Sequence, residues 1–332
     1  MYEFTREPAP NHLMRHQAWE TQRAAIERCR AIMAPRPRRT TAAATTLTGR
    51  AGTEGPAAAT RASNMPPDSP VFALGTALNL LGLQVPRSYA SPGDRPVIVF
   101  DAPRALRRVP GTRPVTWSPL ATPHAVIDVD GVRCTSPAAT FAHMARFCSL
   151  EHLVAIGDAM ACRDATMHRA GVDVLRGFVD AAGRFVGRPN AVRALRLVRE
   201  RVDSPAETRL RLLATRFGLP CPEPDVIIAV EPTKIRIDMG WPRYRIGLDY
   251  QGAHHRAQYE DDLYRANAIL THRWTVFQVT AGMIGTKEGA AWLFAQVAQA
   301  LAHAGADVGP VRDVPMSVWQ ISNERGGRPT GR

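Results

Sequence analysis

The sequence predicts an α/β (α+β) chain in which a mixed β-sheet flanked by helices follows a mostly helical region with a few strands. The main observation is the order of patterns from residue 204 to residue 280, which reads helix, three strands, helix, strand. These runs cover residues 204–220, 225–231, 234–242, 244–252, 257–273 and 274–280. The second observation is size, because 332 residues of which 45% are hydrophobic suffice for two globular domains.

The N-terminal part begins with a predicted helix within residues 1–33, where apolar side chains recur at helical spacing from residue 12 onward. Residues 34–70 are rich in Pro, Ala, Thr, Gly and Arg and have no apolar periodicity, which predicts a flexible linker or insertion. Residues 71–83 are apolar enough to predict a buried helix. Together these patterns place the first folded domain at 71–200.

Within that domain we expect several short strands followed by helices. Ser136 before Pro137 is typical of a helix start, with Ser as the N-cap and Pro at the first helical position. Residues 172–202 predict two helices that are broken around 183–189. The second of these is strongly basic, and it would either face a nucleic-acid backbone or form a solvated surface. Its arginines are Arg188, Arg193, Arg196, Arg199 and Arg201.

Composition restricts the partners and the compartment of the protein. The formal net charge is +12, from 42 Lys and Arg against 30 Asp and Glu, which favours a polyanionic partner such as DNA. No run of about 18 apolar residues predicts a membrane span, and no secretory signal begins the chain. The five cysteines are dispersed without a CxxC pair, as is typical of reduced thiols in a cytoplasmic protein.

Three carboxylates fall on three successive predicted elements: Glu207 on the helix, Asp238 on the second strand and Asp249 on the third. A hairpin tip at 241–243 would bring Asp238 near Asp249, and Gln251 shares the face of Asp249 because strand side chains alternate. Carboxylates suit the hard cations Mg²⁺ and Mn²⁺. We therefore expect Asp238 and Asp249 to bind such an ion, with Glu207 as a further ligand directly or through water, for phosphodiester chemistry.

The motifs around these residues carry a resemblance to a known family. They read Ser204-Pro205-Ala206-Glu207-Thr208-Arg209-Leu210-Arg211, then Asp238 with Trp241-Pro242, then Asp249-Tyr250-Gln251-Gly252-Ala253-His254-His255-Arg256. About a quarter of the chain resembles the very-short-patch-repair-endonuclease-like branch of the PD-(D/E)xK nuclease superfamily. More closely, it resembles actinobacterial proteins that carry this domain at the C-terminus and whose N-terminal regions resemble AbiEi-type antitoxins.

The resemblance implies a restriction-endonuclease-like domain at 201–305, followed by a tail at 306–332. It adds His255 to the expected catalytic residues, as a base or a phosphate contact. It also implies nucleic-acid contacts at Arg211, His254, Arg256 and Arg265. This chain departs from the family at two positions: Asp249 stands where Glu is usual, and Gln251 where near relatives have Asp and many superfamily members have Lys.

These patterns support two hypotheses from different classes. The first is a metal-dependent DNA endonuclease whose basic N-terminal half positions it on the duplex. The alternative is a catalytically impaired nucleic-acid-binding or antitoxin-like regulator, and Gln251 favours it because an amide offers neither a positive charge nor a proton acceptor. A small-molecule hydrolase is a weaker third candidate, since the sequence has no Gly-x-Ser-x-Gly elbow, phosphate loop or zinc-ligand spacing.

Overall fold

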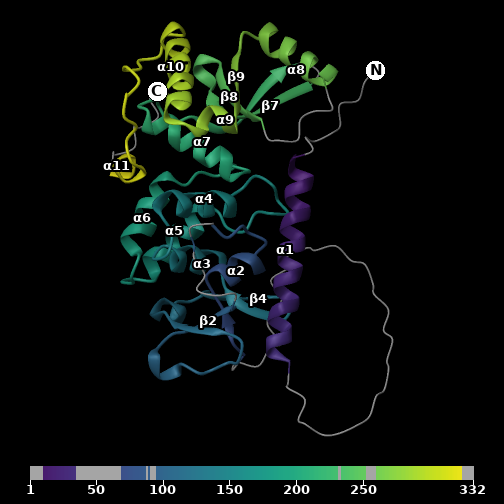
Figure 1. The fold of residues 1–332 in the computed structure, drawn as a ribbon, viewed down its shortest axis with the longest axis vertical. Helices are drawn as coiled ribbons and strands as arrows, with labels where there is room; N and C mark the ends of the chain where they lie inside the picture. Colours follow the sequence, from purple (N-terminus) through teal and green to yellow (C-terminus); the bar gives the residue numbers. More distant parts are fainter. Residues whose placement is uncertain are drawn as a thin grey trace.

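A long N-terminal helix, α1 (Pro10–Met33), runs along the side of the molecule in the computed structural model (Figure 1). The structure describes residues 10–34, 69–86, 89, 95–230, 233–251 and 259–323. The predicted helix at 1–33 is therefore confirmed over its described part, whereas 35–68 of the predicted linker lie outside the described residues. Ile26 and Cys29 of α1 are buried against α2 and the first sheet.

The first sheet has five strands in the order β3-β2-β1-β5-β4 and is mixed. β1 pairs antiparallel with β2 and parallel with β5, while β2–β3 is a parallel pair and β4–β5 an antiparallel one. The strands are β1 (Val71–Phe72), β2 (Val97–Phe100), β3 (Arg113–Thr116), β4 (Val126–Val129) and β5 (Val132–Thr135). The single helix predicted at 71–83 is wrong in part, because β1 precedes the short helix α2 (Gly75–Leu80).

Four helices form the middle of the molecule: α3 (Pro137–Met144), α4 (Leu150–Met160), α5 (Val172–Ala181) and α6 (Arg188–Leu197) (Figure 1). Ser136 Oγ accepts a hydrogen bond from the Ala139 N–H at 3.3 Å, so the predicted Ser-Pro helix start is confirmed. The break between α5 and α6 falls where the sequence predicted it. Two 3₁₀ turns lie in the connections of the first sheet: η1 (Pro103–Ala105) between β2 and β3, and η2 (Ser118–Ala121) between β3 and β4.

The C-terminal part follows the predicted order of helix, three strands, helix and strand, and it lies at the end of the molecule away from the first sheet (Figure 1). Its elements are α7 (Pro205–Arg216), β6 (Glu223–Val230), β7 (Thr233–Trp241), η3 (Pro242–Tyr244), β8 (Ile246–Gln251), α8 (Tyr259–Thr271) and β9 (Thr275–Thr280). The sheet order is β6-β7-β8-β9. Only the β8–β9 pair is parallel, because α8 provides the crossover connection between these two strands.

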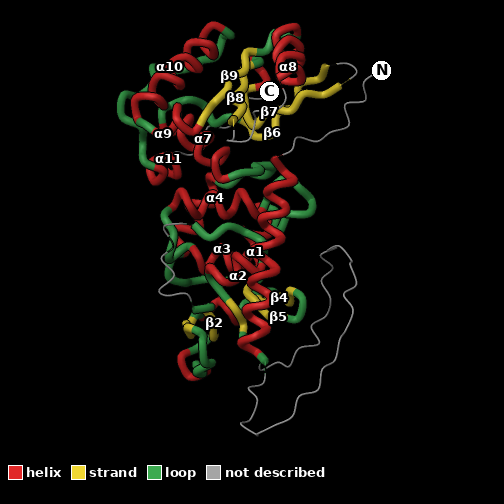
Figure 2. The backbone as a smooth tube through the Cα atoms, turned by 45° about the vertical axis from the view of Figure 1, so that its right-hand side comes forward, coloured by secondary structure: helices red, strands yellow, loops and turns green. Residues whose placement is uncertain are grey.

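Helices cover both faces of this second sheet. One hydrophobic cluster joins α7 and the helix α10 (Lys287–His303) to β7 and β8, and another joins Ile269 of α8 to β6 and β7. The short helix α9 (Ala281–Gly285) links β9 to α10. Figure 2 shows α8 beside the strands and α1 passing the middle helices toward β4 and β5. The chain is thus a mixed α+β protein with two separate mixed sheets.

Residues 306–323, predicted as part of a tail, pack against the helices instead. The Arg312 N–H donates to the Phe217 carbonyl at 3.0 Å, and the Met316 N–H donates to the Arg216 carbonyl at 2.8 Å. The helix α11 (Val318–Asn323) then contacts α6, α7 and α4. Among the described residues, no helix combines the length and apolar character needed to cross a membrane.

Candidate functional site

Asp238 and Asp249 lie beside each other on the two central strands, β7 and β8. The antiparallel ladder ends with the pair Met239 and Leu248, and Asp238 and Asp249 are the residues that flank this last pair. The Tyr250 N–H donates a hydrogen bond to Asp238 Oδ2 at 2.6 Å. Burial, together with the neighbouring Asp249 carboxylate, raises the pKa of Asp238 to about 7. The β7–β8 turn that the sequence predicted at 241–243 therefore brings these two carboxylates together.

Strand β7 changes the face it buries at Asp238. Residues 237 and 239 of a regular strand share one face. Here Ile237 packs in the cluster with Ile269 of α8, whereas Met239 packs in the cluster with α7 and α10. Opposite Asp238 in the ladder, Asp225 of β6 has a left-handed φ of 57°. Asp238 therefore lies at the point where β7 passes from the cluster with α8 to the cluster with α7 and α10.

Glu207 approaches the same cluster from the first turn of α7. Its N–H donates to Ser204 Oγ at 3.2 Å, and its Oε2 accepts from the Asp203 N–H at 3.0 Å, so the side chain folds back over the helix start. Burial and the Asp238 carboxylate raise the pKa of Glu207 well above its usual range. Glu207 is thus both a helix cap and the third member of the predicted carboxylate group.

Asp249 has cationic and amide partners within the described chain. Its side chain is buried, with 6% of the residue exposed, and Oδ2 accepts from Gln251 Nε2 at 3.2 Å and from Arg265 Nη2 at 3.1 Å. Gln251 also bonds Gln278 of β9, and Arg265 donates to the Arg236 carbonyl at 2.6 Å. Gln251 thus shares the face of Asp249, as predicted. Arg265 was expected to contact phosphate, but its guanidinium is held against Asp249 as a counter-charge.

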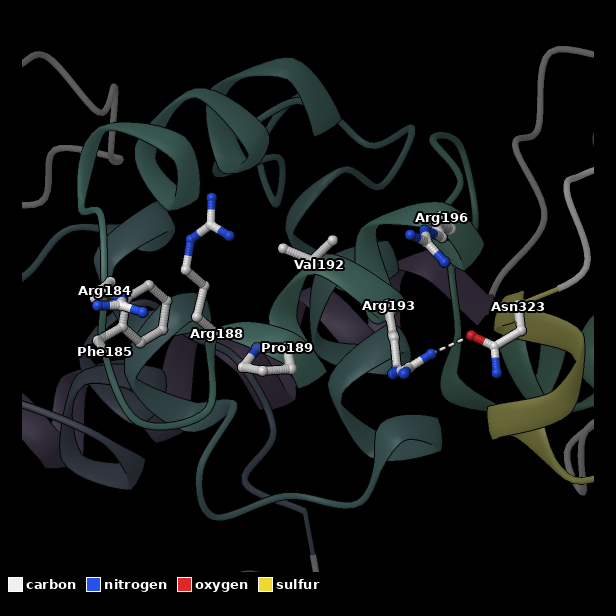
Figure 3. Close-up of a pocket in the computed structure, with 8 residues that line it drawn as sticks. All are labelled: Arg184, Phe185, Arg188, Pro189, Val192, Arg193, Arg196 and Asn323. Carbon is white, nitrogen blue, oxygen red and sulfur yellow. Dashed lines mark hydrogen bonds between the residues drawn. The ribbon is translucent and has the colours of Figure 1, made fainter.

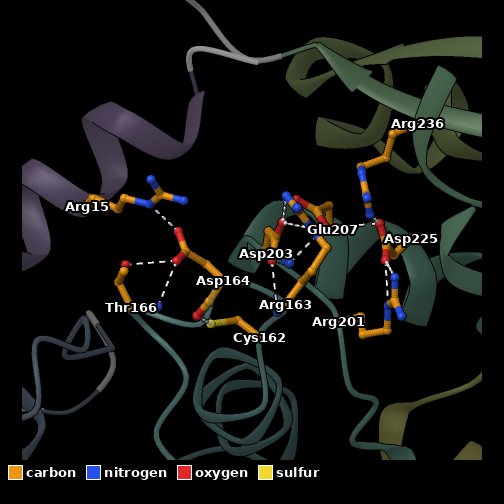
Figure 4. Close-up of polar contacts among 10 residues, drawn as sticks. All are labelled: Arg15, Cys162, Arg163, Asp164, Thr166, Arg201, Asp203, Glu207, Asp225 and Arg236. Atoms are coloured by element: carbon orange, nitrogen blue, oxygen red, sulfur yellow. Dashed lines mark hydrogen bonds and ion pairs between the residues drawn. The ribbon is translucent and has the colours of Figure 1, made fainter. Parts of the chain in front are cut away.

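A frame of charged residues that no sequence pattern predicted surrounds Glu207 (Figure 4). The Asp225 side chain is 3% exposed and forms ion pairs with Arg201 and Arg236. Arg163, from the loop after α4, donates to Asp203 Oδ2 at 2.8 Å and 3.0 Å. This frame connects the helical middle of the molecule to the second sheet. The sequence indicates this frame only through Asp225, an acidic residue at the start of the strand predicted at 225–231.

Arg211 corrects one of the predicted nucleic-acid contacts. Its side chain is 1% exposed, and Nη2 donates to Asp158 Oδ2 of α4 at 2.6 Å. The Asp158 carboxylate also accepts hydrogen bonds from Thr208 Oγ1 and from the Arg199 N–H, each at 2.8 Å. A buried guanidinium with a buried partner cannot reach a phosphate. Arg211 instead joins α7 to α4, and it lies on the same side of α7 as Thr208, three residues earlier, which donates to the same carboxylate.

Three predicted site residues, His254, His255 and Arg256, lie outside the described residues. Within the described ranges, no group of three or more His, Cys, Asp or Glu side chains is arranged to hold a metal ion. The described chain instead supplies two neighbouring pairs, Glu207 with Asp238 and Asp238 with Asp249. Carboxylate pairs of this kind match the ligand requirement of Mg²⁺, which keeps several waters and takes one or two protein carboxylates.

Comparison with known proteins gives no match: no family model, no curated protein and no solved structure matches this chain.

Proposed function

We propose that the protein is a metal-dependent DNA endonuclease that hydrolyses phosphodiester bonds at the cluster of Glu207, Asp238 and Asp249. The observation that carries the proposal is the buried position of Asp238 beside Asp249, since burial together with the Asp249 carboxylate raises the pKa of Asp238 to about 7. Neighbouring buried carboxylates repel each other, so their assembly costs folding free energy unless a proton or a cation neutralises them. Groups perturbed in this way are concentrated at functional sites.

The donor set fits a hard divalent cation. Carboxylate oxygens are the ligands that Mg²⁺ and Mn²⁺ prefer, and we expect Asp238 and Asp249 to hold the ion while Glu207 adds a direct or water-mediated contact. Such an ion, when bound, neutralises charge on the phosphate and lowers the pKa of a coordinated water. The order α7-β6-β7-β8-α8-β9 is in keeping with a restriction-endonuclease-like domain of the very-short-patch-repair type.

Gln251 occupies the position beside Asp249 from which a side chain can orient an attacking water. Its amide contacts both Asp249 and Gln278, so the side chain is held between β8 and β9. An amide positions a water by hydrogen bonding but does not accept its proton, so we expect modest activity.

A second function has its own support: a catalytically impaired nucleic-acid-binding or antitoxin-like regulator that keeps the nuclease fold as a scaffold. Gln251 and Arg265 both donate to Oδ2 of Asp249. The Arg265 guanidinium neutralises part of the charge that a metal ion would otherwise balance. In this alternative the protein binds DNA and leaves it intact.

Cleavage of supercoiled and linear DNA in Mg²⁺, Mn²⁺ or EDTA tests the proposal. We expect cleavage only with metal, and we expect Asp249→Ala to reduce it by about 100-fold or more, the scale of losing one group that stabilises a transition state. The matched control is Asp173→Ala, which removes a carboxylate whose side chain is 97% exposed on α5. DNA binding by Asp249→Ala should be unchanged or tighter, since one negative charge near the phosphates is removed.

Gln251→Lys distinguishes the two functions. A Lys ammonium beside Asp249 can stabilise negative charge that develops on the phosphate, so we expect this variant to cleave faster than the wild type. Metal-independent cleavage, or cleavage that survives the loss of Asp249, would show that the site is assigned wrongly. DNA binding without cleavage by wild type and Gln251→Lys would support the regulator.

A further inference from the structure

A hollow lined by arginines lies on α6, on the helical part of the molecule. Its volume is about 540 Å³. The lining residues come from the α5–α6 loop, from α6 and from the end of α11, and Figure 3 shows their side chains distributed around Val192. They are Arg184, Phe185, Arg188, Pro189, Val192, Arg193, Arg196 and Asn323. No acidic residue belongs to this lining.

Two of the four arginines are held in place by α11. Arg193 donates to Asn323 Oδ1, and its guanidinium lies 4.7 Å from the ring centroid of Trp319. Arg196 Nη1 donates to the Ser322 carbonyl at 3.0 Å. Each of these hydrogen bonds uses one of the five donors of its guanidinium, and the contacts fix the direction of the side chain. The remaining donors stay available along the hollow.

The other two arginines have donors without a protein partner. Arg184 is exposed and makes no hydrogen bond or ion pair with any other described residue. Arg188 forms one ion pair, with Asp180 at 3.3 Å, and its Nε is buried without a hydrogen-bond partner among the described residues. A buried donor without a partner costs free energy that a ligand oxygen would recover. The hollow is therefore suited to an anion with several acceptor oxygens.

We infer that this hollow binds a phosphate group of a nucleic-acid backbone, at a second site separate from the carboxylate cluster. Guanidinium forks match phosphate oxygens in geometry and charge, and Pro189 and Val192 offer apolar contact to an adjacent sugar. The volume exceeds the need of a single phosphate, which favours a phosphodiester over a small free ion. The assignment of this phosphate to DNA rests on the proposed function.

The connection from α6 to α7 supports this assignment. After α6 ends at Leu197, the chain reaches Arg201 and Asp203, which pair with Asp225 and Arg163 next to Glu207. A backbone held at the hollow is thus bound to the segment that leads directly into the carboxylate cluster. The hollow would contribute binding free energy and salt dependence, while the cluster would carry out the chemistry.

Fluorescence anisotropy with a short labelled DNA duplex in EDTA tests the inference, because no cleavage is then required. We expect the double variant Arg184→Ala with Arg188→Ala to weaken binding by about tenfold or more, because it removes two guanidinium groups that would donate charged hydrogen bonds to the phosphate. The slope of log affinity against log salt should fall in magnitude by about 1, because the hollow neutralises one phosphate and each phosphate contributes about 0.9 to the slope. The charge-matched control is Arg104→Ala with Arg108→Ala, two exposed arginines at and after η1, for which we expect little change.

Three outcomes would overturn the inference. The first is equal weakening by the double variant and its control, which would make the hollow part of a general basic surface. The second is wild-type protein that binds inorganic pyrophosphate at the hollow but not DNA. The third is wild-type protein that binds neither ligand. Circular dichroism and thermal melting verify that both double variants are folded. Cleavage assays are independent of this test, so the hollow and the nuclease proposal can fail separately.

Discussion

Replacing Asp238 by Asn tests whether burial and repulsion of the clustered carboxylates lower the free energy of unfolding. Asn has nearly the shape of a protonated Asp, and its carbonyl oxygen can still accept the hydrogen bond that the Tyr250 N–H donates at 2.6 Å. The substitution therefore removes the charge and keeps the contact. Any change in stability then reports on the charge and its neighbours Glu207 and Asp249.

The size and sign of the effect follow from the pKa of Asp238, which folding raises from 3.8 to about 7. A shift of this size corresponds to at most about 4 kcal/mol, at about 1.4 kcal/mol per pH unit. Between these two values the folded protein keeps a proton that the unfolded chain has lost, so the free energy of unfolding falls as pH rises. Because Glu207 and Asp249 share the cost, we expect Asp238→Asn to be more stable than the wild type by about 2–3 kcal/mol at about pH 8 and nearly equal to it at about pH 4.

Urea unfolding across this pH range in EDTA measures the difference, with Asp173→Asn as the control for an exposed carboxylate. Parallel stability curves for wild type and Asp238→Asn would refute the reasoning, since the cluster would then carry no pH-dependent cost. Repeating the series with Mg²⁺ adds a test of metal binding. A cation held by Asp238 and Asp249 should stabilise the wild type by about 2.7 kcal/mol at a hundredfold excess over its dissociation constant, and the variant by much less.

Two further predictions concern the contacts that connect the helical layer to the second sheet. Arg211→Met should lower the free energy of unfolding by about 3–5 kcal/mol in urea, because it leaves Asp158 buried without its cation, and adding Asp158→Leu should recover much of that loss. Failure of the second substitution to restore stability would contradict this explanation. Asp225→Asn keeps a residue type that tolerates the left-handed backbone but removes the charge shared by Arg201 and Arg236, so we expect a loss of about 1–3 kcal/mol in the same assay. Its control is again Asp173→Asn, and equal stability of the two variants would show that the arginines do not depend on Asp225.

The sequence alone determined the order of the C-terminal elements. Strand-like runs of residues marked β6, β7, β8 and β9. The turn after Trp241 predicted that β7 pairs with β8, but it did not fix the register, and a slip of one residue would turn one carboxylate to the other face. The turn therefore predicted the neighbourhood of Asp238 and Asp249, and the register that the folded sheet adopts brings the two carboxylates together. Alternation of strand side chains likewise placed Gln251 with Asp249.

Tertiary structure alone decided which charged groups serve the site and which serve the scaffold. Arg211 and Arg265 carry the same guanidinium, but one is buried against Asp158 of α4 and the other faces Asp249. Asp225 forms ion pairs with arginines from three separate segments of the chain. Strand β1 has only two residues, and it is held as a strand by pairing with β2 and β5. Contacts of this kind depend on how separate elements pack, and no periodicity within one segment reports on its partner. The local pattern determined which elements carry the carboxylates, and the packing of these elements determined the register between them and the charges around them.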